Sequence, residues 1–338
     1  RMAGPLSLIR FAIVLCDRVD CGVEVEKTTT YCIVLGYCIV LGYCIVLGPV
    51  LGKAEGMNGD YDQMRSDNKP PTPQDSTKPV SWQDHYVVIT GPTASGKSAL
   101  ALAIAEMADG VVINADSMQL YGDLHLVTAR PDAGDEARVP HRLYGVLDGS
   151  ERASVGMWLG LAATQMAAAR SAGKLPIITG GNGMYINGGL AGIAPIPDVP
   201  ADIHAECVNR HHAVGGAAFR AELARLDPPL AARLFDGDSQ RLVRAMGVVL
   251  ATGRPLSGWQ QEPHKGQLPG VPLCLAVMPP REILYERINK RFDWMLDHGA
   301  LDEVAALTKR HLDPALPVMK ALGVRELSAY LAGDLTLD

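Results

Sequence analysis

Hydrophobic runs and amphipathic stretches divide most of the chain after residue 82 into strands and helices. Four short, hydrophobic runs predict strands: HYVVIT at 85–90, VVIN at 111–114, HRLYGV at 141–146 and LPIITGG at 175–181. Segments rich in Ala and Leu at 98–108 and 154–170 predict helices between them. Strands that alternate with helices indicate an α/β fold, with a parallel sheet covered by helices on both faces.

The second half of the chain has mainly helical patterns. Residues 198–258 are predicted to form a mostly helical insertion, and YERINKRFDWML at 285–296 predicts a further helix. Leu284, Ile288, Phe292 and Met295 follow at i, i+4, i+8 and i+11, so we expect them to form the apolar face that seats this helix.

The first 82 residues do not match this pattern. YCIVLG occurs three times between Tyr31 and Gly48, and residues 28–52 carry no charge, so length alone would predict a membrane-spanning helix. A Gly in each copy and a six-residue period argue against it. We expect an upstream extension of the reading frame, with Met57 or Met64 as the natural start; a genuine membrane anchor or leader is the alternative. Residues 58–79 are polar and Pro-rich, as in disordered segments.

The expected organisation therefore has four parts. These are an atypical N-terminal extension (1–82), an α/β core (83–197), a helical insertion (198–258) and a return to the core (259–338). A hydrophobic content of 48% and a charged content of 20% are typical of a soluble globular protein. Five of the seven cysteines lie in the first 44 residues, so the body is Cys-poor, and we expect a cytoplasmic protein with no Cys-based metal site.

The strongest chemical signal is GPTASGKS at residues 91–98, which matches G-x-x-x-x-G-K-[ST]. It follows a predicted strand and opens a predicted helix, which is the context in which this motif cradles phosphate. The expected phosphate-binding residues are Gly91, Pro92, Thr93, Ala94, Ser95, Gly96, Lys97 and Ser98. Backbone N–H groups and the Lys97 charge suit phosphate oxygens, and the Ser98 hydroxyl suits Mg²⁺, the one cofactor that we expect.

A second polar cluster follows the next predicted strand. Asp116, Ser117 and Gln119 come after VVINA, and ligands of open α/β sheets bind at the carboxyl ends of the strands. No hydrophobic strand ends in an Asp-Glu pair, and no N-K-x-D motif is present. The sequence therefore argues against a motor ATPase and a GTPase.

Seven blocks together resemble the tRNA dimethylallyltransferase (tRNA isopentenyltransferase) family from about residue 85 to the end. They stand in that family's order: GPTASGKS, NADSMQLY, VPHRL, LPIITGGNGMYI, DGDSQRLVRAM with TGRPLS, RINKRFDWML and KALGVREL. The resemblance implies a P-loop NTPase-like fold. It also implies transfer of a dimethylallyl group from dimethylallyl diphosphate to N6 of adenine 37 in the tRNA anticodon loop, with release of diphosphate.

The demands of that reaction can be matched to residues. The adenine amine is almost non-basic, so a carboxylate must accept its proton, and Asp116 is the expected general base. The departing diphosphate needs stabilisation, for which the resemblance implies Arg291 in addition to Thr93 and the rest of the P-loop. Arg287 shares a helix face with Arg291 and is a weaker candidate.

A base stacked in an anticodon loop has to be swung out of the stack, so flanking nucleotides must be held. The resemblance implies tRNA contacts by the following residues: Asp116, Ser117, Met118, Gln119, Asn182, Gln240, Arg241, Leu242, Val243, Arg244, Lys320 and Arg325. The net charge of −6 excludes a uniformly basic surface but not a local basic channel. We expect a monomer with no membrane association.

Two other enzymes fit parts of the pattern. One is an adenylate isopentenyltransferase that acts on free nucleotides, and the other is a small-molecule P-loop kinase that uses Mg-ATP. His141 is expected to be a structural residue rather than a catalyst. Asn182 and Val324 stand where the family usually has Thr and an aromatic residue, and the family continues beyond DLTLD with a basic, aromatic helix.

Overall fold

The computed structural model describes residues 31–32, 45–47 and 84–336. The expected start sites, membrane anchor and disordered lead-in fall on residues 1–30, 33–44 and 48–83, outside the described residues. The chain folds into two compact units. Unit 1 comprises the residues up to Leu190 together with Leu268–Asp338, and unit 2 comprises Ala191–Gln267. The insertion expected at 198–258 lies inside unit 2.

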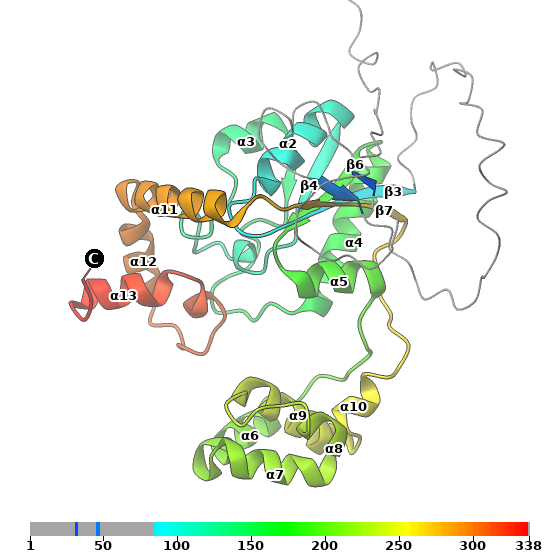
Figure 1. The fold of residues 1–338 in the computed structure, drawn as a ribbon, viewed down its shortest axis with the longest axis vertical. Helices are drawn as coiled ribbons and strands as arrows, with labels where there is room; N and C mark the ends of the chain where they lie inside the picture. Colours follow the sequence, from blue (N-terminus) through cyan, green and yellow to red (C-terminus); the bar gives the residue numbers. More distant parts are fainter. Residues whose placement is uncertain (1–30, 33–44, 48–83, 337–338) are drawn as a thin grey trace, which may run out of the picture. The chain divides into compact units, whose positions relative to one another are not determined.

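A seven-stranded sheet forms the centre of unit 1, in the order β1-β2-β7-β3-β6-β4-β5 (Figure 1). Its strands are β1 (Tyr31–Cys32), β2 (Ile45–Leu47), β3 (His85–Thr90), β4 (Gly110–Asn114), β5 (His141–Arg142), β6 (Leu175–Gly180) and β7 (Val271–Val277). The five strands from β7 to β5 are parallel, as expected for the predicted α/β fold, but β7 is not among the four strands predicted from the sequence. β2 pairs antiparallel with β7, and β1 with β2. These two strands come from the YCIVLG repeat and were not predicted.

Helices cover both faces of the sheet, with α2 on one side and α4 on the other (Figure 1). The helices of unit 1 are α2 (Lys97–Ala108), α3 (Ala133–Arg138), α4 (Val155–Ser171), α5 (Gly183–Ala191, whose last residue falls in unit 2), α11 (Arg281–Asp297), α12 (Ala300–Thr308) and α13 (Val324–Ala332), with short 3-10 helices η3 (Met118–Leu120) and η4 (Val318–Lys320). Alternation along the strands explains the packing. Val87 and Ile89 of β3 and Ile177 of β6 pack with α2 in one core cluster. Their neighbours along each strand point to the opposite face of the sheet.

The predicted strand HRLYGV is wrong in its length, because only His141 and Arg142 pair with β4. Leu143 has a φ of +64° and Gly145 a φ of +61°, so the backbone turns away from the sheet after two residues. The Leu143 carbonyl instead accepts a hydrogen bond from Asn114 Nδ2 at 2.9 Å. His141 Nδ1 lies 3.0 Å from the Val139 carbonyl, in keeping with the expected structural role.

Unit 2 contains α6 (Ala201–Val214), α7 (Gly216–Leu226), α8 (Pro228–Ala231), α9 (Ser239–Thr252) and α10 (Leu256–Trp259). Its own apolar core gathers Phe219, Leu223, Leu242 and Val248 around α9. Asp227 is fully buried and accepts hydrogen bonds from the backbone N–H groups of Leu230 and Ser257. These bonds join the start of α8 to α10, which holds the small helices together.

The apolar face predicted for α11 is only partly correct. Met295 is buried and Leu284 and Ile288 are half-buried, but Phe292 is 41% exposed. At 100° per residue the inward face is centred between Arg291 and Met295, and Phe292 lies about 80° away from it. An arginine therefore occupies the inward position that the hydrophobic pattern assigned to the aromatic ring. Among the described residues, no helix has the length and apolar character required to cross a bilayer.

Candidate active site

A cavity of about 370 Å³ opens in unit 1, at the carboxyl ends of the parallel strands. The strand register brings these ends together, since Thr90 pairs with Gly180 and Asn114 with Thr179. The cavity is lined by most of the P-loop, by polar residues after β4 and by residues of α11. The lining residues are Thr93–Ala99, Asp116, Gln119, Thr128, Ala129, Tyr144, Thr179–Gly181, Arg287 and Arg291.

The P-loop conformation requires glycine at its first position. Gly91 has a φ of +151°, and a Cβ there would lie 2.3 Å from the Val277 carbonyl oxygen of the neighbouring strand. Ala94 is also in the left-handed region, with a φ of +61°. The loop then leads directly into α2, which begins at Lys97, so backbone N–H groups and the positive end of the helix face the cavity.

Lys97 is a half-buried cation of the site. Its Nζ donates a hydrogen bond to the Pro92 carbonyl at 2.6 Å, which folds the side chain back over the loop. Burial lowers the pKa of Lys97 to about 8; the charge of Asp116 opposes this shift and that of Arg291 adds to it. Burial also lowers the pKa of Arg291. Two cations that stand half-dehydrated in one cavity form a site for a strongly charged anion.

Asp116 is held by its own neighbours. Its backbone N–H donates to Asn114 Oδ1 at 2.7 Å, and its Oδ1 accepts from the Met118 N–H at 2.9 Å. Oδ2 and Lys97 Nζ each lie 4.0 Å from the point where a Cβ on Gly181 would stand. Asn114 is fixed in turn, because the Trp158 indole N–H donates to its carbonyl at 2.7 Å. A carboxylate oxygen is thus presented beside the phosphate-binding loop.

The structure brings together many, but not all, of the residues predicted from sequence. Thr93 to Ser98, Asp116, Gln119 and Arg291 line the one cavity. Gly91 and Pro92 belong to the loop but do not line the cavity. Ser117 and Met118 are half-buried and follow Asp116 in the chain. Asn182 caps α5, where its Oδ1 accepts from the Met184 and Tyr185 N–H groups at 3.0 and 3.3 Å. Lys320 and Arg325 line a separate hollow of about 350 Å³.

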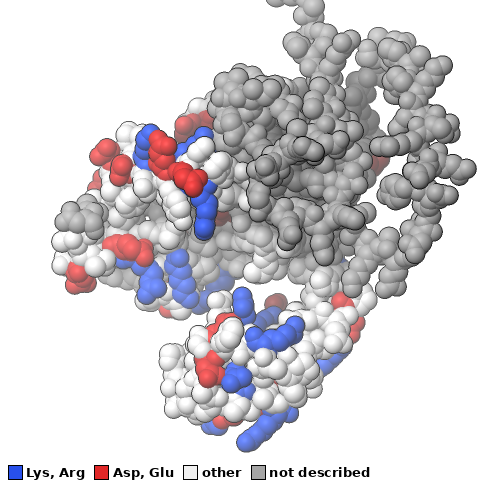
Figure 2. All heavy atoms as spheres, in the orientation of Figure 1, with Lys and Arg blue, Asp and Glu red and all other residues white. Residues whose placement is uncertain are grey.

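Leu242 and Val243, two of the predicted tRNA contacts, have side chains buried in the core of unit 2, with exposed fractions of 0% and 6%. Because α9 is the central helix of that unit, most of its circumference is packed. Gln240 and Arg241 are exposed and Arg244 is half-exposed on the remaining strip. Figure 2 shows Lys or Arg side chains, alongside acidic ones, on the visible face of this unit.

Several lining residues were missed by sequence reasoning. Tyr144 was assigned to a strand, but it lies in the turn after β5 and lines the cavity. Burial raises its pKa, and the charge of Asp116 adds to the shift, so the phenol stays protonated. Thr179 could have been predicted to line the cavity, because it lies near the end of a predicted strand and ligands bind at the carboxyl ends of such strands. Thr128 and Ala129 carry no sequence signal, because they reach the cavity only through a loop.

This arrangement defines a class: an α/β protein with a P-loop, in which a phosphate-binding loop, three cations (Lys97, Arg287 and Arg291) and a carboxylate share one cavity. Comparison with known proteins identifies the family. The IPP transferase model matches residues 119–338, and the isopentenyl transferase model matches residues 84–151. The chain belongs to the IPP transferase family.

Similar curated proteins carry one name. The tRNA dimethylallyltransferase of Rhodospirillum rubrum is 52% identical over 74% of this chain and 77% of that protein. The tRNA dimethylallyltransferase of Rhodopseudomonas palustris is 50% identical over 75% of this chain and 79% of its own length.

Solved structures agree with the fold. The tRNA isopentenylpyrophosphate transferase of Bacillus halodurans has a TM-score of 0.51 and 30% identity, covering 75% of this chain and 79% of that one. A eukaryotic dimethylallyltransferase described as acting on tRNA has a TM-score of 0.63 and 25% identity, covering 74% of this chain and 64% of that one. The P-loop α/β fold predicted from sequence is confirmed.

Proposed function

We propose that this protein transfers a dimethylallyl group from dimethylallyl diphosphate to N6 of adenine 37 in the anticodon loop of tRNA, releasing diphosphate. The observation that carries the proposal is the shared cavity of unit 1. Lys97, Arg291 and the P-loop suit a diphosphate, and Asp116 places a carboxylate beside them. Membership of the IPP transferase family supports the same reaction.

On the diphosphate side, the residues act by stabilising charge that grows as the C–O bond breaks. Backbone N–H groups of the P-loop, the Thr93 hydroxyl, Lys97 Nζ and the Arg291 guanidinium are the donors. All are fixed by the loop or by α11, so little reorganisation is needed when the charge develops. The phosphates are held only to be discarded, and the reacting carbon is the one attached to them.

The residues of the cavity also fit Mg²⁺. Ser98 Oγ lines the cavity, and Thr179 Oγ1 is buried there with no hydrogen-bond partner among the described residues. In P-loops a Ser or Thr hydroxyl binds Mg²⁺. The ion usually has few protein ligands and completes its coordination with substrate phosphates and water. When bound by Ser98, the ion would neutralise part of the diphosphate charge. No cluster of three His, Cys, Asp or Glu side chains in the described part of the chain offers an all-protein metal site.

On the acceptor side, Asp116 is the general base. Its Oδ1 is engaged by the Met118 N–H, and Oδ2 is the oxygen on the cavity side. As the N6–carbon bond forms, Oδ2 accepts the proton that the amine loses. For the RNA around the target base we propose contacts by Gln240, Arg241 and Arg244 of α9, and by Lys320 and Arg325. We also propose that the protein is a cytoplasmic monomer.

The test is incubation with labelled dimethylallyl diphosphate and unmodified tRNA. We expect label on tRNA, one diphosphate released per label, and no consumption of ATP. Label on AMP but not on tRNA would favour an adenylate isopentenyltransferase. ATP-dependent phosphorylation of a small acceptor, without prenyl transfer, would favour a kinase. Either result would overturn the proposal.

The lowered pKa of Lys97 gives a pH prediction. The side chain is charged below pH 8, its pKa being about 8, and it loses its proton as the pH rises through that value. Since kcat/KM reports the free enzyme, kcat/KM for dimethylallyl diphosphate should fall above pH 8, by up to about tenfold per pH unit. The measurement is kcat/KM between pH 6.5 and 9.5. The Lys97→Met variant should lack this descending limb; a wild-type profile flat to pH 9.5 would contradict the assignment.

A further inference from the structure

A half-buried carboxylate outside the cavity accepts hydrogen bonds from three consecutive backbone N–H groups. Glu303, in the first turn of α12, accepts from His125 and Leu126 (3.0 Å) through Oε1 and from Val127 (2.8 Å) through Oε2. Consecutive N–H groups that converge on one point form an anion site, and here the anion is a side chain about 177 residues away in the chain. Such charge-assisted bonds are stronger than neutral ones and fix the geometry of the backbone that donates them.

The backbone that Glu303 holds is the 124–130 loop, which also holds Gln119. Gln119 Nε2 donates to the carbonyls of Thr128 at 2.9 Å and Ala129 at 3.0 Å. Both amide hydrogens are thereby used, and this fixes the orientation of Oε1, the acceptor of the side chain. Gln119, Thr128 and Ala129 line the cavity together with Asp116. The position of Gln119 Oε1 therefore depends on the position of the loop.

Hydrogen bonds within the loop join its first residues to its last, so a shift of residues 125–127 should also move residues 128 and 129. The Ala129 N–H donates to the Leu126 carbonyl at 2.9 Å, and the Arg130 N–H to the His125 carbonyl at 3.0 Å. Ala129 has a φ of +52°, a conformation that a residue with a side chain keeps only when its surroundings impose it. If the N–H groups of residues 125–127 lose their acceptor, the carbonyls that hold Gln119 move with them.

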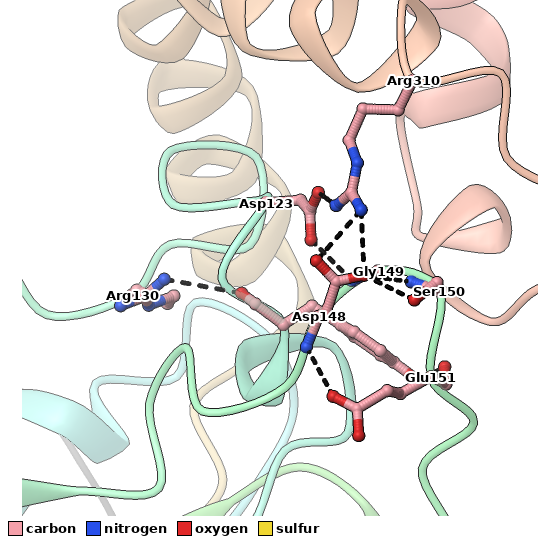
Figure 3. A network of polar contacts seen from close by, with 8 residues as sticks. Asp123, Arg130, Asp148, Gly149, Ser150, Glu151 and Arg310 are labelled. Atoms are coloured by element: carbon pink, nitrogen blue, oxygen red, sulfur yellow. Dashed lines mark hydrogen bonds and ion pairs between the residues drawn. The ribbon is translucent and has the colours of Figure 1, made fainter.

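Glu303 also joins this loop to the helix that follows α11, another element that lines the cavity. α11 carries Arg291, and α12 follows it after Gly299, whose φ of +104° permits the reversal. Further along, Arg310 pairs with Asp123, which precedes the loop, and, at 2.9 Å, with Asp148 (Figure 3). Neither Glu303 nor Arg310 lines the cavity.

We propose that Glu303 is a positioning residue for the acceptor side of the cavity: it holds the 124–130 loop so that Gln119 Oε1 is fixed beside Asp116, where the acceptor base enters. The inference rests on the proposed function. An amide in place of this carboxylate has one oxygen instead of two and turns an NH₂ group toward N–H donors, so at least one of the three bonds is lost. Within the described residues, neither the P-loop nor Arg291 has a recorded hydrogen bond to this loop, so we expect the diphosphate side to be little affected.

The test is a double-mutant cycle with Glu303→Gln and Gln119→Ala, assayed by transfer of labelled dimethylallyl to tRNA. E303Q should lower kcat/KM for tRNA roughly 10- to 100-fold, because small misplacements near a reacting group have effects of this size. The KM for dimethylallyl diphosphate should change less than about twofold, since its binding residues are untouched. If Glu303 acts through Gln119, the double variant should be no slower than the slower single variant.

Asp302→Asn is the matched control, because Asp302 is the exposed neighbour on the same helix and loses the same charge. Melting temperatures within about 3 °C of wild type show that the variants are folded. E303Q activity equal to that of D302N, or fully multiplicative losses in the cycle, would overturn the inference. If E303Q does not fold, Glu303→Asp, which shortens the side chain but keeps its charge, replaces it in the same cycle with the same criteria. A wild-type enzyme that does not label tRNA would instead refute the proposed function.

Discussion

Replacing Asp116 by Asn is expected to lower kcat for prenyl transfer about 1,000-fold, within the range that positioned general bases contribute. The substitution is nearly isosteric, and the amide oxygen can still accept the Met118 N–H that Asp116 Oδ1 accepts at 2.9 Å. The loop after β4 should therefore keep its shape. What is lost is the cavity-facing oxygen that can accept a proton, so the effect should fall on kcat while the affinity for tRNA changes less than about threefold.

The measurement is single-turnover transfer of labelled dimethylallyl to tRNA, with tRNA affinity measured separately. Asp132→Asn is a matched control, since Asp132 caps α3 through the Asp135 N–H and Asn can cap in the same way. This control should retain wild-type activity. An Asp116→Asn enzyme that keeps more than about a tenth of wild-type kcat would remove Asp116 from the role of base.

The placement of the P-loop and of Asp116 was predictable, because short contiguous segments determine it. The strand, loop and helix around Lys97 are contiguous, and their order determines where the N–H groups point. Asp116 was predictable for a similar reason, as the residue after a buried strand in a parallel sheet. In both cases a few neighbouring residues determine the geometry.

What could not be predicted depends on contacts between distant segments. The contacts between Glu303 and the 124–130 loop leave no local pattern, because a glutamate in the first turn of a helix is an ordinary surface residue in most proteins. Phe292 was predicted to face inward because it fits the hydrophobic pattern of α11. In the structure Phe292 is exposed, and Arg291 lies on the inward face and lines the cavity. β5 is short because Leu143 adopts a positive φ. A positive φ is rare for leucine and cannot be predicted from the residue type.

Replacing Lys97 by Met is expected to reduce kcat/KM for dimethylallyl diphosphate roughly 100- to 1,000-fold, as for other preorganised charge-stabilising donors. Methionine fills much of the same volume, so the P-loop should persist; the bond from Nζ to the Pro92 carbonyl is the only hydrogen bond that the structure records for this ammonium group within the described residues. The lost charge has no substitute at that point, because Arg291 approaches from α11 rather than from the loop.

The loss should appear as weaker binding of dimethylallyl diphosphate and slower transfer of its dimethylallyl group, with tRNA affinity unchanged, because the proposed role of Lys97 is to stabilise the departing diphosphate. Initial rates over a range of both substrates separate the two effects. Lys309→Met, an exposed lysine at the end of α12 outside the cavity, is the matched control and should behave as wild type. If K97M instead weakened tRNA binding and spared the diphosphate, the two sides of the cavity would have to be exchanged, and the roles of Asp116 and Arg291 with them.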